Sequence, residues 1–183
     1  MARFESCAQK WMDMSEAYYG VSLLNDCKYG HSGLGGVMGL TLIKSGIEPN
    51  PVADRGEHVF TYALLPHAGD WRSAGTIQQA YCLNQPALAV QGGETGDFFS
   101  LCSVNKPNVV VETIKQAEDG DGVIVRMYES HNARTPVTFT WNRPVSSVEE
   151  CNAIEEKKGD IAVKNGAFSF VIKPYELKTF RVR

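Results

Sequence analysis

Apolar and polar residues alternate along several short segments of the chain. In Val137–Trp141 the three apolar residues fall on one side of an extended strand and the two threonines fall on the other. Such alternation predicts antiparallel strands that bury one face and leave the other in solvent. Similar segments rich in β-branched and aromatic residues predict strands at 59–65, 123–128 and 168–172.

Glycine, proline and acidic residues separate these predicted strands. Asp119-Gly120-Asp121-Gly122 lies between residues 108–115 and 123–129, and Asp-Gly is favoured where a hairpin turn needs positive φ. We therefore predict a β-hairpin there. Further turns or loops are expected at 33–36, 48–51 and 91–94. One short helix is expected around Ala74–Tyr81, where Ile77 and Tyr81 share a face.

A glycine-rich segment at residues 91–97 divides the chain. It separates a first part, residues 1–90, from a second part, residues 98–183, and is interpreted as a linker. The second part offers about seven short strands at close intervals, as in an immunoglobulin-like sandwich, although it lacks that fold's Cys-Trp-Cys arrangement. The first residues, Arg3–Met14, suggest a strand without a lead-in. We therefore expect the first part to leave a strand edge or an apolar patch uncovered.

Composition restricts the class of protein. The 183 residues are 43% hydrophobic and 21% charged, with a formal net charge of −3, which is ordinary for a globular chain. No basic cluster is present to attract nucleic acid, and no apolar run of about 18 residues or secretory pattern points to a membrane or to export. We therefore predict that the protein binds neither nucleic acid nor membranes. We also predict that it is cytoplasmic.

Five cysteines, an odd number without Cys-x-x-Cys spacing, indicate reduced thiols instead of disulfides or a zinc knuckle. Cys82 and Cys102 have apolar neighbours and are expected to be small core residues. Cys27 lies in a polar turn, but no histidine adjoins it in the sequence to act as the base that a nucleophile needs.

Several residues invite a chemical interpretation. The spacing of Asp54, His58, His67 and Asp70 could suggest zinc, yet strand residues four apart are about 13 Å apart, so a polar rim is the simpler expectation. Residues 30–36 fail the phosphate-loop patterns. The acidic hairpin turn lacks the ligand pattern of an EF-hand.

A glycosidase needs paired carboxylates. Nothing in the sequence singles out such a pair among the acidic candidates, which are Asp26, Glu57, Glu118, Asp119 and Asp121. Aromatic residues expected at the surface could stack on sugar rings or pack against another part of the protein. These aromatics are Trp11, Tyr18, Tyr19, Tyr29 and Trp71.

A series of motifs in one order spans nearly the whole chain. It comprises residues 20–30, 40–45, 54–71, 81–86 and 117–129. Together they resemble the carboxyl-terminal β-region of family 38 glycoside hydrolases, the α-mannosidases, in their cytosolic and bacterial branch. The resemblance implies an all-β chain. Residues 1–90 would be the end of a large mutarotase-like β-sandwich, and residues 98–183 a small immunoglobulin-like β-sandwich.

The same resemblance implies that the chemistry lies elsewhere. In this family zinc and an aspartate nucleophile belong to an amino-terminal domain with a His-x-Asp motif, and none of the four histidines, His31, His58, His67 and His131, has Asp at the second following position. No catalytic residue or cofactor is therefore expected here. Zinc or another divalent metal is expected in the catalytic domain of the same full-length chain. That domain would be this region's partner, mannose-containing glycans would be the substrates, and homo-oligomers are left open.

The resemblance leaves a supporting role for this chain. The Asn25–Gly30 turn is too polar to be expected in a core, so we interpret it as a candidate for the substrate rim or for domain docking. The complete set of candidates is Asn25, Asp26, Lys28, Tyr29, His31, His67, Asp70 and Trp71. Two other functions stay open: a free-standing carbohydrate-binding sandwich, and an interaction module whose open strand edges pair with another chain.

Overall fold

The computed structural model describes residues 5–92, 96 and 99–183. The chain divides into two compact units, Met1–Gly92 and Gly93–Arg183, and each is described by itself. Much of the expected linker at 91–97, namely residues 93–95 and 97, lies outside the described residues. The domain limits predicted from the sequence therefore stay a prediction.

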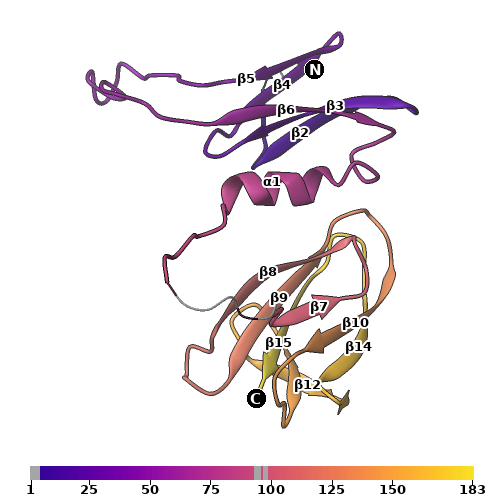
Figure 1. The fold of residues 1–183 in the computed structure, drawn as a ribbon. Coiled ribbons are helices and arrows are strands. Elements are labelled where there is room, and N and C mark those ends of the chain that lie inside the picture. Colours follow the sequence, from indigo (N-terminus) through magenta and orange to yellow (C-terminus); the bar gives the residue numbers. More distant parts are fainter. Residues whose placement is uncertain (1–4, 93–95, 97–98) are drawn as a thin grey trace. The chain divides into compact units, whose positions relative to one another are not determined.

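The first unit contains two three-stranded antiparallel sheets and a helix (Figure 1). One sheet has the order β1-β4-β5, with β1 at Ser6–Cys7, β4 at Gly30–Leu34 and β5 at Val37–Leu40. The other has the order β2-β3-β6, with β2 at Trp11–Ser15, β3 at Tyr19–Asn25 and β6 at Tyr62–Ala68. The segment 30–36, rejected above as a phosphate loop, is a strand and turn leading to β5.

Helix α1 (Thr76–Asn84) runs along the β2-β3-β6 sheet and confirms the expected helix, shifted by a few residues (Figure 1). It buries Ile77 and Ala80. Strand β6 begins three residues later than the predicted strand at 59–65. The reason is local, because the Thr61 N–H donates to the Asp26 carboxylate, 2.9 Å away, instead of extending the strand ladder.

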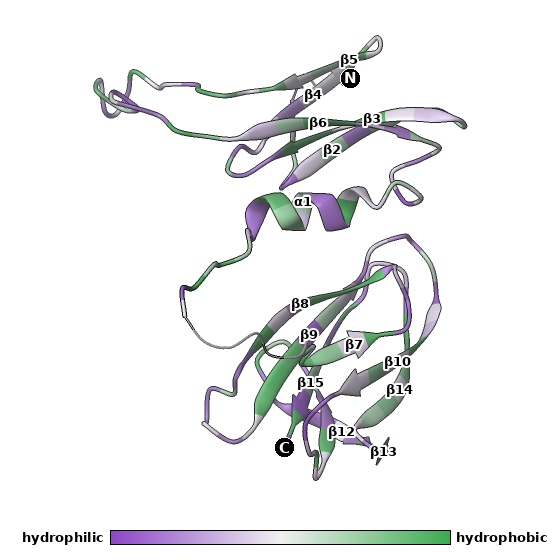
Figure 2. Ribbon diagram, in the orientation of Figure 1, coloured by the Kyte–Doolittle hydropathy of each residue, from purple (hydrophilic) through white to green (hydrophobic). Residues whose placement is uncertain are grey.

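The first unit has a small core and much uncovered apolar surface. Among its described residues, four hydrophobic side chains are buried, namely Leu23, Leu24, Ile77 and Ala80. Fourteen large hydrophobic residues are exposed in the same unit: Tyr18, Tyr19, Tyr29, Leu34, Val37, Leu42, Ile43, Ile47, Val52, Val59, Tyr62, Leu64, Leu88 and Val90. Figure 2 shows hydrophobic stretches on its strands and on the segment that leads from β5 to β6. Large contiguous apolar patches on a protein normally mark sites that pack against another protein, a membrane or a ligand.

The second unit is a β-sandwich of a four-stranded and a five-stranded sheet. The four-stranded sheet has the order β13-β14-β10-β7, with β13 at Val163–Lys164, β14 at Ala167–Ile172, β10 at Thr135–Trp141 and β7 at Cys102–Val104. The other has the order β12-β11-β15-β9-β8, with β12 at Lys157–Ile161, β11 at Val148–Cys151, β15 at Leu177–Val182, β9 at Val123–Glu129 and β8 at Val109–Gln116.

Side chains from both sheets fill the interior of this sandwich. The ring centroid of Phe168 lies 5.1 Å from that of Phe139 and 4.9 Å from that of Phe180, joining β14 to β10 and β15. The alternation predicted for Val137–Trp141 is confirmed, since its three apolar residues are buried and its threonines are partly exposed. In contrast with the first unit, the second unit therefore has a complete core.

The predicted hairpin is also confirmed. Strands β8 and β9 pair antiparallel around the turn at 117–122, in which Gly120 and Gly122 adopt φ of 80° and 94°. A side chain at Gly122 would lie 2.7 Å from the Val182 carbonyl oxygen, so both backbone conformation and space require glycine there. The fold class is all-β, with α1 the one α-helix among the described residues.

Candidate functional site

The turn after β3 is held by a buried asparagine. Asn25 is 1% exposed; its Oδ1 accepts a hydrogen bond from the Lys28 N–H at 2.7 Å, and its carbonyl accepts one from Asn84 at the end of α1. His31 is also buried and donates from Nδ1 to the Tyr29 carbonyl, so its Nε2 accepts from Asn25 Nδ2 at 3.1 Å. The expectation that this turn is too polar for a core is wrong for Asn25, because His31 and the Lys28 N–H satisfy the polar groups of its side chain.

The next two residues of the turn are exposed and interact with each other. The pKa of Asp26 is lowered by hydrogen bonds from the Cys27 thiol and from the Thr61 N–H. The same contact with the Asp26 carboxylate raises the pKa of the Cys27 thiol, since a nearby anion disfavours the thiolate. Cys27 is therefore a poor nucleophile, in agreement with the absence of a neighbouring base in the sequence.

Lys28 and Tyr29 present the outward side of the turn. The Lys28 ammonium lies 4.6 Å from the centre of the Phe60 ring, a cation–π contact that holds the side chain against the segment preceding β6. Tyr29 is 57% exposed. The turn thus projects polar side chains outward, and the hydrogen bonds of the buried Asn25 hold it in place.

His67 belongs to a buried polar network between the β2-β3-β6 sheet and α1. Its Nε2 donates to Asp13 at 2.8 Å, the Ser22 hydroxyl donates to the same carboxylate oxygen, and Thr76 of α1 bonds to Ser22 at 2.7 Å. The His67 and Asp13 side chains are 5% and 4% exposed. The set resembles a hydrolytic triad in composition only, because Ser22 is fully buried and contacts the carboxylate instead of the imidazole. We interpret the network as structural.

Asp70 and Trp71 lie in the loop between β6 and α1, which comprises residues 69–75. Asp70 accepts hydrogen bonds from the backbone N–H groups of Ser73 and Arg72, and these bonds, together with the Arg72 guanidinium, lower its pKa. The Trp71 ring packs 5.1 Å from the Trp11 ring, and the Arg72 guanidinium lies 4.2 Å from the Trp71 ring centre. Trp11 and Trp71 are therefore partly buried against each other, whereas Tyr18, Tyr19 and Tyr29 are exposed as expected.

Metal-ligating side chains do not converge in the part of the chain that the structure describes: no group of three or more His, Cys, Asp or Glu residues could hold an ion. His58 Nε2 instead bonds to the Asp54 carbonyl at 2.7 Å. At the acidic hairpin, Asp119 pairs with Arg181 and Asp121 with Arg183, at 2.6 and 2.7 Å. These carboxylates form ion pairs with Arg181 of β15 and with the residue that follows this strand.

Sequence reasoning missed two buried carboxylates, Glu129 and Glu155. Burial alone would raise the pKa of Glu129, but hydrogen bonds from the Tyr175 N–H, the Asn108 amide and the His131 N–H outweigh it and lower the pKa. The alternation of β9 could have revealed Glu129, which shares the buried face with Val125 and Met127. Glu155 gives no such signal, because it lies in a turn at φ 70° and meets Lys115 from β8.

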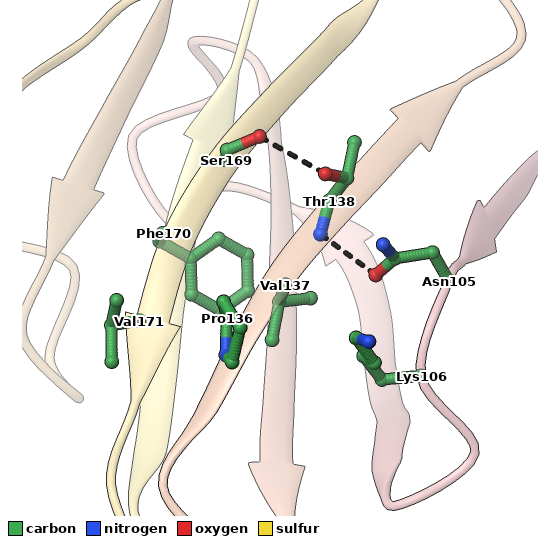
Figure 3. Close-up of a pocket in the computed structure, with 8 residues that line it drawn as sticks. All are labelled: Asn105, Lys106, Pro136, Val137, Thr138, Ser169, Phe170 and Val171. Atoms are coloured by element: carbon green, nitrogen blue, oxygen red, sulfur yellow. Dashed lines mark hydrogen bonds between the residues drawn. The ribbon is translucent and has the colours of Figure 1, made fainter.

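A shallow cavity of about 440 Å³ lies beside β10 in the second unit (Figure 3). The Thr138 N–H donates to the Asn105 side chain at 2.8 Å, and the Thr138 and Ser169 hydroxyl groups are 3.1 Å apart. Lys106 supplies the single charged group of the lining. Without a paired acid and base, this cavity offers no hydrolytic chemistry.

The cysteines are all unpaired. Cys151 is buried and Cys102 partly so, and burial raises the pKa of both thiols. Cys82 is exposed on α1, so its assignment to the core is wrong. Its neighbours in sequence are apolar, but the helix places them on other faces.

No helix among the described residues is long and apolar enough to cross a membrane.

Comparisons with known proteins identify similar chains. The model of the glycosyl hydrolases family 38 C-terminal domain matches residues 1–52, and that of the family 38 C-terminal beta sandwich domain matches residues 108–180. Alpha-mannosidase G of Dictyostelium discoideum is 42% identical, over 98% of this chain and 17% of its own length. Alpha-mannosidase 2C1 of Homo sapiens is 38% identical, over 96% of this chain and 18% of its own length.

A solved structure has a fold similar to that of this chain. The crystal structure of an alpha-mannosidase from Enterococcus faecalis V583 superposes with a TM-score of 0.75 at 21% identity, over 98% of this chain and 21% of that chain. This chain thus spans less than a fifth of the curated relatives it matches.

Proposed function

We propose that this chain is the non-catalytic part of a longer α-mannosidase, because it belongs to the carboxyl-terminal β-region of glycosyl hydrolase family 38. Its direct role is to pack against the portion of the enzyme that carries the chemistry. The whole enzyme would remove mannose residues from α-mannosides, and zinc or another divalent metal would be held by that other portion.

The observation that carries this proposal is the unequal burial of the two units. The second unit has a full core, whereas the described part of the first unit buries four hydrophobic residues and exposes fourteen large ones. On the exposed face of β6, Tyr62 and Leu64 are 57% and 64% accessible. Burying a side chain of this size contributes about 1.5–3 kcal/mol, so a partner surface from the same enzyme would add several kcal/mol of stability.

A substitution in the full-length enzyme tests this role. Leu64→Asp should lower the melting temperature and the α-mannosidase activity, because it places a charge in the docked surface. Leu64→Met, which keeps size and polarity, is the matched control and should behave like the wild type. Unchanged stability and turnover in the Leu64→Asp enzyme would contradict docking through β6. The 183-residue chain by itself should not hydrolyse an aryl α-mannoside.

The exposed and partly exposed members of the candidate set supply the polar side of this role. We assign Asp26, Lys28, Tyr29, Asp70 and Trp71 to the rim of the substrate pocket or to the domain contact, since their side chains project from rigid turns. Asn25, His31 and His67 support them from within. Lys28→Ala in the full-length enzyme should change KM or turnover without lowering the melting temperature by more than a few degrees.

Carbohydrate binding by the isolated chain is the competing proposal. The exposed rings of Tyr18, Tyr19 and Tyr29 would be its stacking surfaces. Calorimetric titration of the 183-residue chain with mannose and mannose-rich glycans separates the two functions. Saturable heat would favour a binding module, and no heat would favour the docking role.

The cytoplasmic location is likewise a proposal, and the five unpaired cysteines support it.

A further inference from the structure

The segment between β5 and β6 makes little contact with its own unit. We define residues 42–59 as the arm. Figure 1 shows it running out beyond the ends of β5 and β6 before it returns. Apart from the half-buried Ala53, every residue of the arm is exposed. Connections longer than about 15 residues without secondary structure are uncommon, and they are usually either functional loops or linker segments.

Hydrogen bonding isolates the arm further. Its bonds are internal: Ala53 N–H to the Asn50 carbonyl at 3.1 Å, Arg55 N–H to the Val52 carbonyl at 3.3 Å, and His58 to the Asp54 carbonyl. Within the described residues, no hydrogen bond or ion pair ties the arm to any other segment. Its charged side chains are therefore not used to hold it against its own sheets.

The arm nevertheless carries side chains that favour burial. Ile47 is 79% exposed and Val59 is 85% exposed, with Ile43 and Val52 about half exposed. A solvated linker is normally polar and rich in glycine or serine. Two prolines, Pro49 and Pro51, restrict the backbone, so docking the arm costs less conformational entropy than docking a flexible loop.

We infer that the arm docks onto the portion of the same polypeptide that lies outside this chain, with Ile47 as its apolar anchor. This inference rests on the proposed function. The choice of occupant follows from the relatives, which match this chain over 96–98% of its length yet extend far beyond it, leaving more than four fifths of their own chains outside the match. The occupant is an apolar surface of that portion, and a second copy of the chain is the alternative outcome.

Hydrogen exchange of the full-length enzyme, read by mass spectrometry on peptides within residues 42–59, tests this inference. The arm amides should exchange at least about tenfold more slowly than the same sequence free in solution, corresponding to roughly 1.4 kcal/mol. Ile47→Asp should abolish this protection. Ser45→Asp, which adds the same charge at an exposed polar position two residues earlier, should leave it unchanged.

Three outcomes would overturn the inference. In the first, the wild-type arm exchanges as fast as the free sequence. In the second, its protection disappears on dilution together with a dimer, which would identify a second copy as the occupant. In the third, Ser45→Asp removes protection as strongly as Ile47→Asp. Lack of α-mannosidase activity in the full-length protein would refute the proposed function, whereas arm exchange is measured independently of activity.

Discussion

Replacing Glu129 by glutamine should destabilise the second unit strongly. The carboxylate is 1% exposed at the end of β9. One oxygen accepts hydrogen bonds from the Asn108 amide and the His131 N–H, both at 2.8 Å, and the other accepts from the Tyr175 N–H at 3.0 Å. It thereby joins the start of β8, the turn after β9 and the turn before β15.

The magnitude follows from these bonds. A glutamine keeps the size of the side chain, but its NH₂ group faces either the Tyr175 N–H or the pair of donors opposite, so at least one buried donor loses its acceptor. Hydrogen bonds to a charged group contribute about 1.5–3 kcal/mol each, and an unsatisfied buried donor costs about 1–3 kcal/mol. Because the variant also avoids burying a charge, we expect a net loss of about 2–4 kcal/mol.

The dependence on pH identifies the carboxylate as the cause. The pKa of Glu129 in the folded chain lies below the ordinary value of 4.5, so its contribution is complete above that value and is lost as the pH falls through the lower, folded pKa. The difference between wild type and Glu129→Gln should therefore be constant near neutral pH. It should shrink only below about pH 4.5.

Urea denaturation measures this difference. Trp141 lies 8% exposed in the core of the second unit, and its fluorescence reports on that unit when Trp11 and Trp71 are replaced by phenylalanine in both proteins. Glu118→Gln makes the same chemical change at an exposed carboxylate and should cost less than about 1 kcal/mol. A Glu129→Gln protein within about 0.5 kcal/mol of wild type at neutral pH would refute the reasoning.

Three other changes probe the packing and the turn. Gly20→Ala should destabilise the first unit, because a Cβ would lie 2.3 Å from Cε1 of His67, and its melting temperature should partly recover in a double variant with His67→Ala. Phe180→Ala, at a fully buried ring, should cost about 3–5 kcal/mol in denaturant unfolding. Asp26→Asn should speed alkylation of Cys27 near neutral pH, followed by mass spectrometry, since the carboxylate raises the pKa of that thiol; an unchanged rate would exclude this cause.

Local patterns were sufficient for much of the second unit. Alternation identified the strands around Val137 and Phe168, and Asp-Gly identified the β8–β9 turn, because burial on one strand face and positive φ are properties of neighbouring residues. The alternation of buried residues along β9 would also have identified Glu129 as a buried side chain. It could not find Glu155, whose partner Lys115 is far away in the sequence.

The candidate site depended more on tertiary structure. The sequence marks the Asn25–Gly30 turn as polar, but only the fold shows that Asn25 is buried against His31 and the end of α1. The pairing of the acidic hairpin with Arg181 and Arg183 likewise joins residues 62 apart in the chain. Whether a polar side chain is solvated or buried depends on such distant partners.

The sequence by itself thus determined an all-β chain, its family resemblance and the absence of a His-x-Asp motif, since these properties depend only on the order of the residues. The sequence also predicted an uncovered strand edge or apolar patch in the first part, but only the tertiary structure decided which of its side chains stay uncovered and that the second unit has a full core. The physical reason is that burial is a property of the surfaces that meet in the fold. An isoleucine such as Ile47 is equally hydrophobic wherever it lies, and its surroundings alone determine whether water reaches it.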